Sequence, residues 1–302
     1  MYSGRGMNLG LKLGLPTRVG LLLAALAYFS FAFYEMTISS LEDKIVANPT
    51  FTDLPAALGL GFRTVGGFII VIAIVLYFFK NHLSKPEAIM CARLLVVLEA
   101  AYWLSLLPSA YVGLGALWYP GIFGLTFLIS TGLPCLVQAV LMPIVLVKLF
   151  YELSPSRPAK NALKWGLISG TSYLLISWLN NMGMWIYGVF EKGMEYVSLY
   201  PVNAYSFIVS VIGLLLLTVY AAYFSKKSFG AKSLGELDLR KIGLIIILFG
   251  LYMDVNYMLW LVFGSVGGWG SWYAWMLGHN MDQWLLALPL LGLPLFFHRN
   301  ND

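Results

Sequence analysis

Charged side chains are scarce in this chain: Asp, Glu, Lys and Arg make up 11% of its 302 residues, whereas 60% are hydrophobic. A soluble globule of this length needs more ionisable groups to cover its surface. The composition therefore excludes an ordinary soluble domain and indicates a lipid bilayer as the main partner. The formal net charge of +5 does not predict nucleic-acid binding, because the basic residues stand in short runs between apolar stretches.

Cysteine and histidine are also scarce, with two and three residues. Cys91 and Cys135 lie in apolar stretches without the spacing of a disulfide framework or a zinc site, so we expect them to serve packing. His82 and His298 are expected at the membrane surface, which disfavours a bis-histidine haem. The sequence carries no Walker-type phosphate loop, Rossmann fingerprint or nucleophile elbow. These absences disfavour an enzyme and a resident cofactor, although a proton or a cation could bind.

Long apolar runs, in contrast, are abundant. A helix needs about 20 apolar residues to cross the hydrocarbon core of a bilayer, where unpaired backbone groups are too costly for other open structures. Eight runs qualify, at residues 18–40, 56–79, 87–109, 119–149, 162–188, 202–225, 241–264 and 271–297. The prediction is an all-α, polytopic integral membrane bundle of eight transmembrane helices, forming a single transmembrane domain over residues 1–302.

The basic residues predict the orientation of these spans, because Lys and Arg are retained on the cytoplasmic side. Only Lys44 and Lys192 fall on one side of the predicted membrane. Fourteen fall on the other: Arg5, Lys12, Arg18, Lys80, Lys85, Arg157, Lys160, Lys164, Lys226, Lys227, Lys232, Arg240, Lys241 and Arg299. Both termini are therefore expected in the cytoplasm, with the protein in the cell membrane. The basic N-terminus resembles a signal peptide, but no small-x-small cleavage site follows it, so the first helix is expected to be retained.

The two halves of the chain, residues 1–153 and 154–302, show weak similarity to each other. An offset of 146 aligns Gly20 with Gly166 and Lys80 with Lys226. Four spans in each half would form a parallel tandem repeat with a site between the halves. Chance matching within so apolar a chain is the alternative explanation. The spacing of Gly166 and Gly170 is a separate signal, which predicts close packing between helices.

Six charged residues fall within the predicted spans and away from their ends; a charged side chain at the bilayer centre costs about 2.5 to 3.5 kcal/mol. They are Glu35, Arg63, Arg93, Glu99, Asp254 and Asp282. Glu35 and Arg63 are expected at similar depths on consecutive helices, which predicts a structural ion pair. Arg93 is expected to extend its head group to the lipid headgroups.

Helical rise places Glu99, Asp254 and Asp282 at one depth near the middle of the bilayer. If Arg63 is paired with Glu35, these three carboxylates have no assigned basic partner. Such groups hold protons or share a cation. His279, which shares a helix face with Asp282, and Asn256 complete the predicted cluster. Other polar residues of the spans, such as Gln138, Asn180 and Asn181, are expected to add to it or to hold the helices together.

These features predict proton- or cation-coupled transport of a small solute through the carboxylate cluster. The main alternative is a non-catalytic anchor or assembly subunit that binds partner membrane subunits, because the loops are too short for a catalytic domain. Two minority alternatives remain. One is an intramembrane enzyme, disfavoured because Gly278 to Asp282 lacks a Gly-x-Gly-Asp element, and the other is a divalent-metal site at His279, Asp282 and Asp254.

Overall fold

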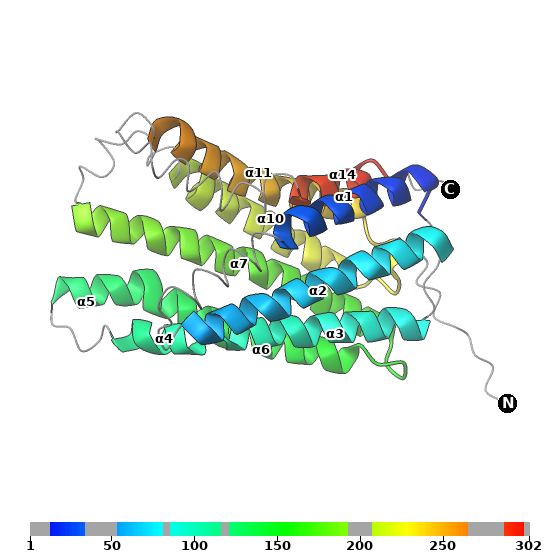
Figure 1. Cartoon of the computed structure of the whole chain (residues 1–302), viewed down its shortest axis with the longest axis horizontal. Coiled ribbons are helices and arrows are strands. Elements are labelled where there is room, and N and C mark those ends of the chain that lie inside the picture. The colour runs from blue at the N-terminus through cyan, green and yellow to red at the C-terminus, as the bar shows by residue number, and fades with distance from the viewer. Residues whose placement is uncertain are drawn as a thin grey trace.

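A computed structural model describes residues 13–33, 53–80, 85–115, 121–192, 207–264 and 287–298, and all regular structure in these ranges is helical (Figure 1). The α-helices are α1 (Leu15–Phe33), α2 (Asp53–Lys80), α3 (Lys85–Leu104), α4 (Leu107–Leu114), α5 (Ile122–Phe127), α6 (Leu133–Glu152), α7 (Ala159–Lys192), α10 (Leu214–Ser228), α11 (Leu239–Gly264) and α14 (Ala287–Phe296). Shorter elements are the π-helical segments η4 (Leu128–Gly132) and η5 (Phe207–Gly213) and the 3-10 turn η6 (Leu234–Glu236). The predicted all-helical class is confirmed for the described residues.

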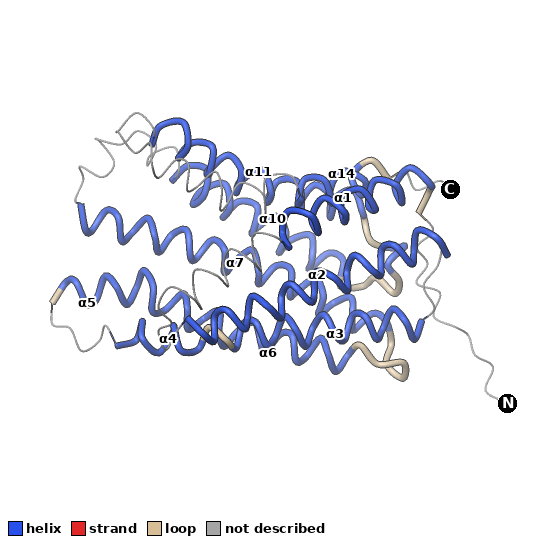
Figure 2. Tube along the Cα trace, viewed as in Figure 1, coloured by secondary structure: helices blue, strands red, loops and turns tan. Residues whose placement is uncertain are grey.

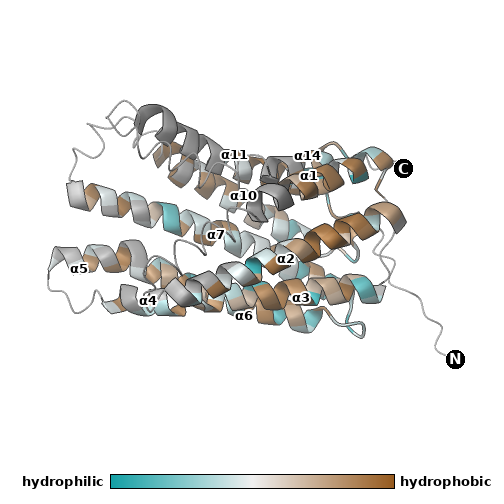
Figure 3. Cartoon of the chain, viewed as in Figure 1, coloured by the Kyte–Doolittle hydropathy of each residue, from teal (hydrophilic) through white to brown (hydrophobic). Residues whose placement is uncertain are grey.

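Three helical segments of the described chain are long and apolar enough to cross a membrane: Gly61–Phe79, Leu133–Glu152 and Phe207–Ser228. A shorter apolar segment, Leu15–Ala27, belongs to α1. Hydrophobic residues cover most of the surface of these helices, as on α2 in Figure 3. Many large apolar side chains, such as Phe79 and Leu216, are exposed. This is the surface that a bilayer would cover.

The long helices form a ring in which neighbours in the chain are neighbours in space. Each of α1, α2, α3, α6, α7, α10 and α11 contacts the next, and α14 contacts both α11 and α1. We call these eight helices the ring. Its closure brings the first described helix against the last.

The loops of the described chain lie mainly at one end of the ring. Figure 2 shows the connections between α6 and α7 and between α10 and α11 at the same end, where α1 also begins and α14 also ends. Basic side chains belong to these connections, among them Arg157 and Lys232. We call this the loop end of the ring.

The third predicted span, 87–109, is shorter than expected. The α3 helix ends at Leu104, and a turn at Ser105 and Leu106 precedes α4. The Ser105 hydroxyl donates a hydrogen bond to the carbonyl oxygen of Tyr102 at 2.6 Å, which satisfies a carbonyl group at the helix end. Pro108 then stands in the first turn of α4, where its missing N–H costs nothing.

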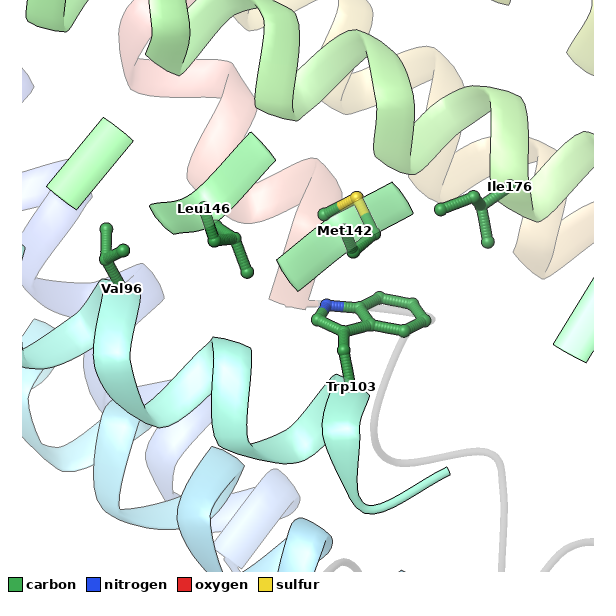
Figure 4. Packing of buried hydrophobic residues seen from close by; sticks show 5 residues of the cluster. All are labelled: Val96, Trp103, Met142, Leu146 and Ile176. Atoms are coloured by element: carbon green, nitrogen blue, oxygen red, sulfur yellow. The ribbon is translucent and has the colours of Figure 1, made fainter. Parts of the chain in front are cut away.

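Side chains from three helices form one hydrophobic cluster. Val96 and Trp103 of α3 pack with Met142 and Leu146 of α6 and with Ile176 of α7 (Figure 4). Each of these side chains is at most 8% exposed. Because Trp103 lies one helical turn after Glu99, this cluster also fixes the helix face that carries the acid.

A second hydrophobic cluster joins the other side of the ring. It contains Leu174 of α7, Leu214, Leu217 and Ala221 of α10, and Phe249 of α11. The two clusters are linked by Tyr173, which packs against both. Together they hold α7 between α6 and α10.

Glycine allows the backbones of α11 and α14 to lie in direct contact. A Cβ atom on Gly292 would lie 2.6 Å from the carbonyl oxygen of Gly243. At Gly166 and Gly170, in contrast, an added Cβ would meet nothing within 4 Å. The prediction that Gly166 and Gly170 mediate close helix packing is therefore wrong, since these glycines border open space.

Candidate functional site

A cavity of about 410 Å³ lies between helices on opposite sides of the ring. We call it the ring cavity. Its walls are mostly apolar and come from α2, α3, α7, α10 and α11; the lining residues are Arg63, Glu99, Gly166, Leu167, Gly170, Thr171, Tyr173, Leu174, Ala221, Phe224, Ser225, Ile242, Ile245, Ile246 and Phe249. This volume falls in the range of about 300 to 1,000 Å³ that is typical of small-molecule pockets.

The ring cavity extends inward from near the loop end. Ser225 is three residues before the end of α10 and Ile242 is three residues after the start of α11, so both lie about 5 Å from the loop end. Glu99 is fourteen residues after the start of α3, which places it about 20 Å along that helix. The charged residues therefore stand at the deep end of an otherwise apolar cavity.

Arg63 of α2 and Glu99 of α3 form an ion pair at this deep end. The Arg63 Nη2 donates to Glu99 Oε1 at 2.7 Å, and Nε approaches Oε2 at 3.4 Å. The two side chains are only 15% and 29% exposed. The fork-like arrangement of a guanidinium on a carboxylate fixes both groups in orientation as well as in distance.

Aromatic rings surround the guanidinium group. Its central carbon lies 3.8 Å from the centre of the Tyr102 ring, 5.6 Å from that of Trp103 and 6.0 Å from that of Tyr173. The faces of aromatic rings attract cations, most strongly where water is excluded. Arg63 is thus stabilised by the rings as well as by Glu99.

Glu99 has one further partner among the described residues. The indole Nε1 of Trp103 donates to Glu99 Oε1 at 3.0 Å, so this oxygen accepts from both Trp103 and Arg63. The Trp103 ring also packs edge-on against Tyr173 at 6.1 Å between centres, and Tyr173 against Phe249 at 5.8 Å. Glu99 is therefore connected through aromatic contacts to α7 and α11.

The pairing of Glu99 corrects one expectation drawn from the sequence. Glu99 was expected to lack a basic partner, because Arg63 was assigned to Glu35, and this is wrong. Arg63 reaches Glu99 because α2 and α3 are neighbours in the ring and both residues lie at the same depth. Glu35 lies outside the described residues, so its own pairing stays a prediction.

The remaining residues of the predicted carboxylate cluster are not tested. His279 and Asp282 lie outside the described residues, and α11 includes Asp254 and Asn256 in its backbone only. Within the described part of the chain, no three His, Cys, Asp or Glu side chains are grouped to hold a metal ion. The alternative metal site at His279, Asp282 and Asp254 accordingly stays a prediction.

Two hydroxyl groups form the other polar feature of the cavity wall. Thr171 Oγ1 of α7 lies 2.9 Å from Ser225 Oγ of α10, and it also donates to the Leu167 carbonyl oxygen at 2.9 Å. This bond ties α7 to α10 at the shallower part of the cavity. The hydroxyls satisfy each other and leave the wall around them apolar.

Other polar residues of the predicted spans bond between helices or within one helix. The Gln138 side-chain amide of α6 donates to the Asn180 side-chain oxygen of α7, and Asn181 donates to the Ser177 carbonyl oxygen of its own helix at 2.8 Å. Arg93 donates through Nε to the Leu153 carbonyl oxygen at 2.6 Å. The head group of Arg93 therefore binds the end of α6, where helix carbonyl groups lack partners, instead of serving only to reach lipid.

The sequence pointed to Arg63 and Glu99 as charged residues but not to their surroundings. Composition does not single out Tyr102, Trp103 and Tyr173, because aromatic residues are common in membrane helices. The spacing of Glu99 and Trp103, one helical turn apart, was an available signal that both share a face. Tyr173 could be placed only by the packing of α7 against α3.

No family model, no curated protein and no solved structure matches this chain in comparisons with known proteins.

Proposed function

We propose that this chain is an eight-span integral membrane protein that transports a small solute through the ring cavity, coupled to a proton or a cation. The proposal includes a location in the cell membrane with both termini in the cytoplasm. The observation that carries it is the Arg63–Glu99 pair at the deep end of an apolar cavity. Keeping such an ion pair away from water costs desolvation free energy, and ionisable residues within membrane helices commonly mark the path of an ion or a substrate.

The helix order supports the number of spans. Each of the eight predicted runs contains at least part of a described helix, with α4 following α3 in the third, α5 and η4 preceding α6 in the fourth, and α14 covering the last part of the eighth. Eight crossings would leave both ends of the chain on one side, which fits the positions of α1 and α14 at the loop end (Figure 1). The proposed 4+4 repeat divides the ring between α6 and α7.

Glu99 is the proposed coupling group, because a carboxylate can release or accept a proton while a guanidinium keeps its charge. Protonation of Glu99 would weaken its bond to Arg63 and alter the deep end of the cavity. Asp254, Asp282, His279 and Asn256 are proposed to extend this site toward the other half of the ring. Their amide or alanine variants belong in the same test.

Transport is tested in proteoliposomes loaded with a pH-sensitive dye. Small organic anions, cations and neutral solutes are added outside, and proton entry is compared with that into empty liposomes. We expect proton entry that depends on one class of solute and is lost in Glu99→Gln. Solute-independent leak, or unchanged entry in Glu99→Gln, would overturn the coupling role of Glu99.

The chain offers a matched control for this variant. Glu152 also pairs with an arginine, Arg157, at 2.7 Å, but it lies at the loop end, and neither residue lines the ring cavity. Glu152→Gln should leave flux unchanged. Gly170→Leu should fill the cavity, since the space beside this glycine is open, and should reduce flux in a protein that still folds. No flux in any protein, together with a partner that copurifies in fixed ratio, would instead support the assembly-subunit alternative.

The orientation is tested by labelling single introduced cysteines with a membrane-impermeant maleimide. Cysteines at Ser156 and Gly235, in the two described loops of the loop end, should react only after the cells are permeabilised. A cysteine at Lys192, at the opposite end of α7, should react in intact cells. The reverse pattern would overturn the proposed orientation.

A further inference from the structure

The two charged groups at the deep end of the ring cavity differ in whether they can lose their charge. Arg63 remains a cation at any physiological pH, and the rings of Tyr102, Trp103 and Tyr173 support that charge independently of Glu99. Glu99, in contrast, becomes neutral when it binds a proton. Its carbonyl oxygen can then still accept the hydrogen bond from Trp103 Nε1.

Charge balance then selects the kind of solute. With the ion pair intact, the described side chains that line the cavity carry no net charge. A bound cation would leave one positive charge uncompensated among apolar walls, because Arg63 cannot lose its own, and such a charge is costly there. A bound anion accompanied by one proton leaves the net charge at zero.

The rest of the cavity wall is mostly apolar, which suits a solute with an apolar body. Among the described lining residues, α10 and α11 contribute no ionisable side chain; their share consists of Ala221, Phe224, Ser225, Ile242, Ile245, Ile246 and Phe249. Among the described helices, the ionisable groups around the ion pair are Tyr102 of α3 and Tyr173 of α7, whose rings lie against the Arg63 guanidinium. Glu99 is the one carboxylate among the ion pair and these groups, so it is the group that gains a proton when its charge is neutralised.

We propose that the ring cavity binds a small amphipathic anion whose charged head replaces the Glu99 carboxylate on Arg63, while Glu99 takes up one proton from water. The ion pair between Arg63 and Glu99 breaks, a new pair forms between Arg63 and the anion, and an O–H bond forms on Glu99. The apolar body of the solute lies between α7, α10 and α11. This inference rests on the proposed function in taking the ring cavity as the solute site.

Permanent ions provide the sharpest probe, because they carry no proton of their own. Benzenesulfonate is a permanent anion, phenyltrimethylammonium a permanent cation, and benzenesulfonamide a neutral molecule of similar shape. Binding to the purified protein is measured by calorimetry at pH 7 in two buffers of different ionisation enthalpy. The difference in heat between the buffers counts the protons taken up.

We expect benzenesulfonate to bind at least tenfold more tightly than the other two probes, with uptake of about one proton for each anion. Glu99→Gln should bind it with no proton uptake and at least equal affinity, because no carboxylate competes for Arg63. Arg63→Gln should lose about tenfold or more in affinity, as expected for a charge-assisted hydrogen bond. Glu152→Gln should behave as the unmodified chain.

Three results would overturn the inference: tighter binding of the cation or the neutral probe, an anion bound without proton uptake, or the same proton uptake in Glu99→Gln. If the Glu99→Gln variant fails to fold, the proton count of the unmodified chain and the loss of binding in Gly170→Leu still decide it. The transport proposal can be refuted independently of the binding inference. Benzenesulfonate that binds with one proton but does not enter proteoliposomes refutes the transport proposal and leaves the binding inference intact.

Discussion

Gly243 of α11 and Gly292 of α14 lie in backbone contact: a Cβ atom added to Gly243 would come within 2.7 Å of the Gly292 carbonyl oxygen and within 2.5 Å of the Phe296 backbone nitrogen. This contact holds α14 in place against α11, and α14 in turn contacts α1. The closure of the ring thus depends on two residues without side chains.

Alanine at either glycine should therefore loosen the ring. We expect Gly243→Ala and Gly292→Ala each to destabilise the protein by about 1 to 3 kcal/mol, because the added methyl group forces the two helices apart. Thermal unfolding in detergent provides the measurement. Gly166→Ala and Gly170→Ala are matched controls that should be neutral or stabilising by up to about 1 kcal/mol, since they meet no atoms and favour helix. Equal effects at all four positions would contradict the contact.

The ion pair predicts that the effects of substitutions at Arg63 and Glu99 on the free energy of unfolding depend strongly on each other. Arg63→Met or Glu99→Leu alone leaves one charge buried without its partner, which costs about 3 to 5 kcal/mol in buried pairs. The double variant should be much less destabilised than the sum of the two single variants. Unfolding of all four proteins under one set of conditions gives the coupling energy. Additive losses would show that the two side chains do not pair.

The effects of substitutions at Gln138 and Asn180 on stability should also depend on each other, but more weakly than those at Arg63 and Glu99. Hydrogen bonds between membrane helices contribute about 0.6 kcal/mol on average and up to about 1.7 kcal/mol, so a coupling energy in this range is expected for Gln138→Leu combined with Asn180→Leu. Asn181 supplies the control, because its amide bonds within α7. Coupling between Gln138 and Asn181 of similar size would argue against the α6–α7 bond.

The start of α11 should become less stable in acid. The side-chain hydrogen bond with Lys241 holds the pKa of Asp238 below its usual value, and the Asp238 carboxylate also accepts the Lys241 backbone N–H at 3.3 Å. A lowered folded-state pKa means that Asp238 stabilises the folded state above the unfolded pKa of about 3.9. That stabilisation is lost as pH falls through the folded-state value.

The acid effect is measured by comparing the unmodified chain with Asp238→Asn. The two unfolding midpoints should differ between pH 5 and 7, begin to approach each other as pH falls below about 4, and converge only below the lowered folded-state pKa of Asp238. A difference that stays constant down to pH 2 would show that the carboxylate charge of Asp238 has no part in it.

Much of this arrangement was predictable from local properties of the sequence. The apolar runs placed α2 and α11 within three residues of their observed starts, because the hydrophobic length needed to cross a bilayer is a property of the chain alone. The break at Ser105 was missed, since the hydroxyl and Pro108 stand in a run that is apolar on average. The open space at Gly166 and Gly170 was missed because a spacing of four says only that two residues share a face.

Composition by itself determined that the chain is helical and that several helices suit a bilayer, because hydrophobicity and backbone hydrogen bonding act on each segment separately. Helical rise converts residue number into distance, and on that basis the sequence predicts Glu99 near the middle of the bilayer and Arg63 at the outer depth of Glu35. Only the tertiary structure decided that these two residues are partners and that Tyr173 faces them. The pairing depends on the rotation of each helix about its own axis, and that rotation is set by packing against neighbours that are distant in the chain.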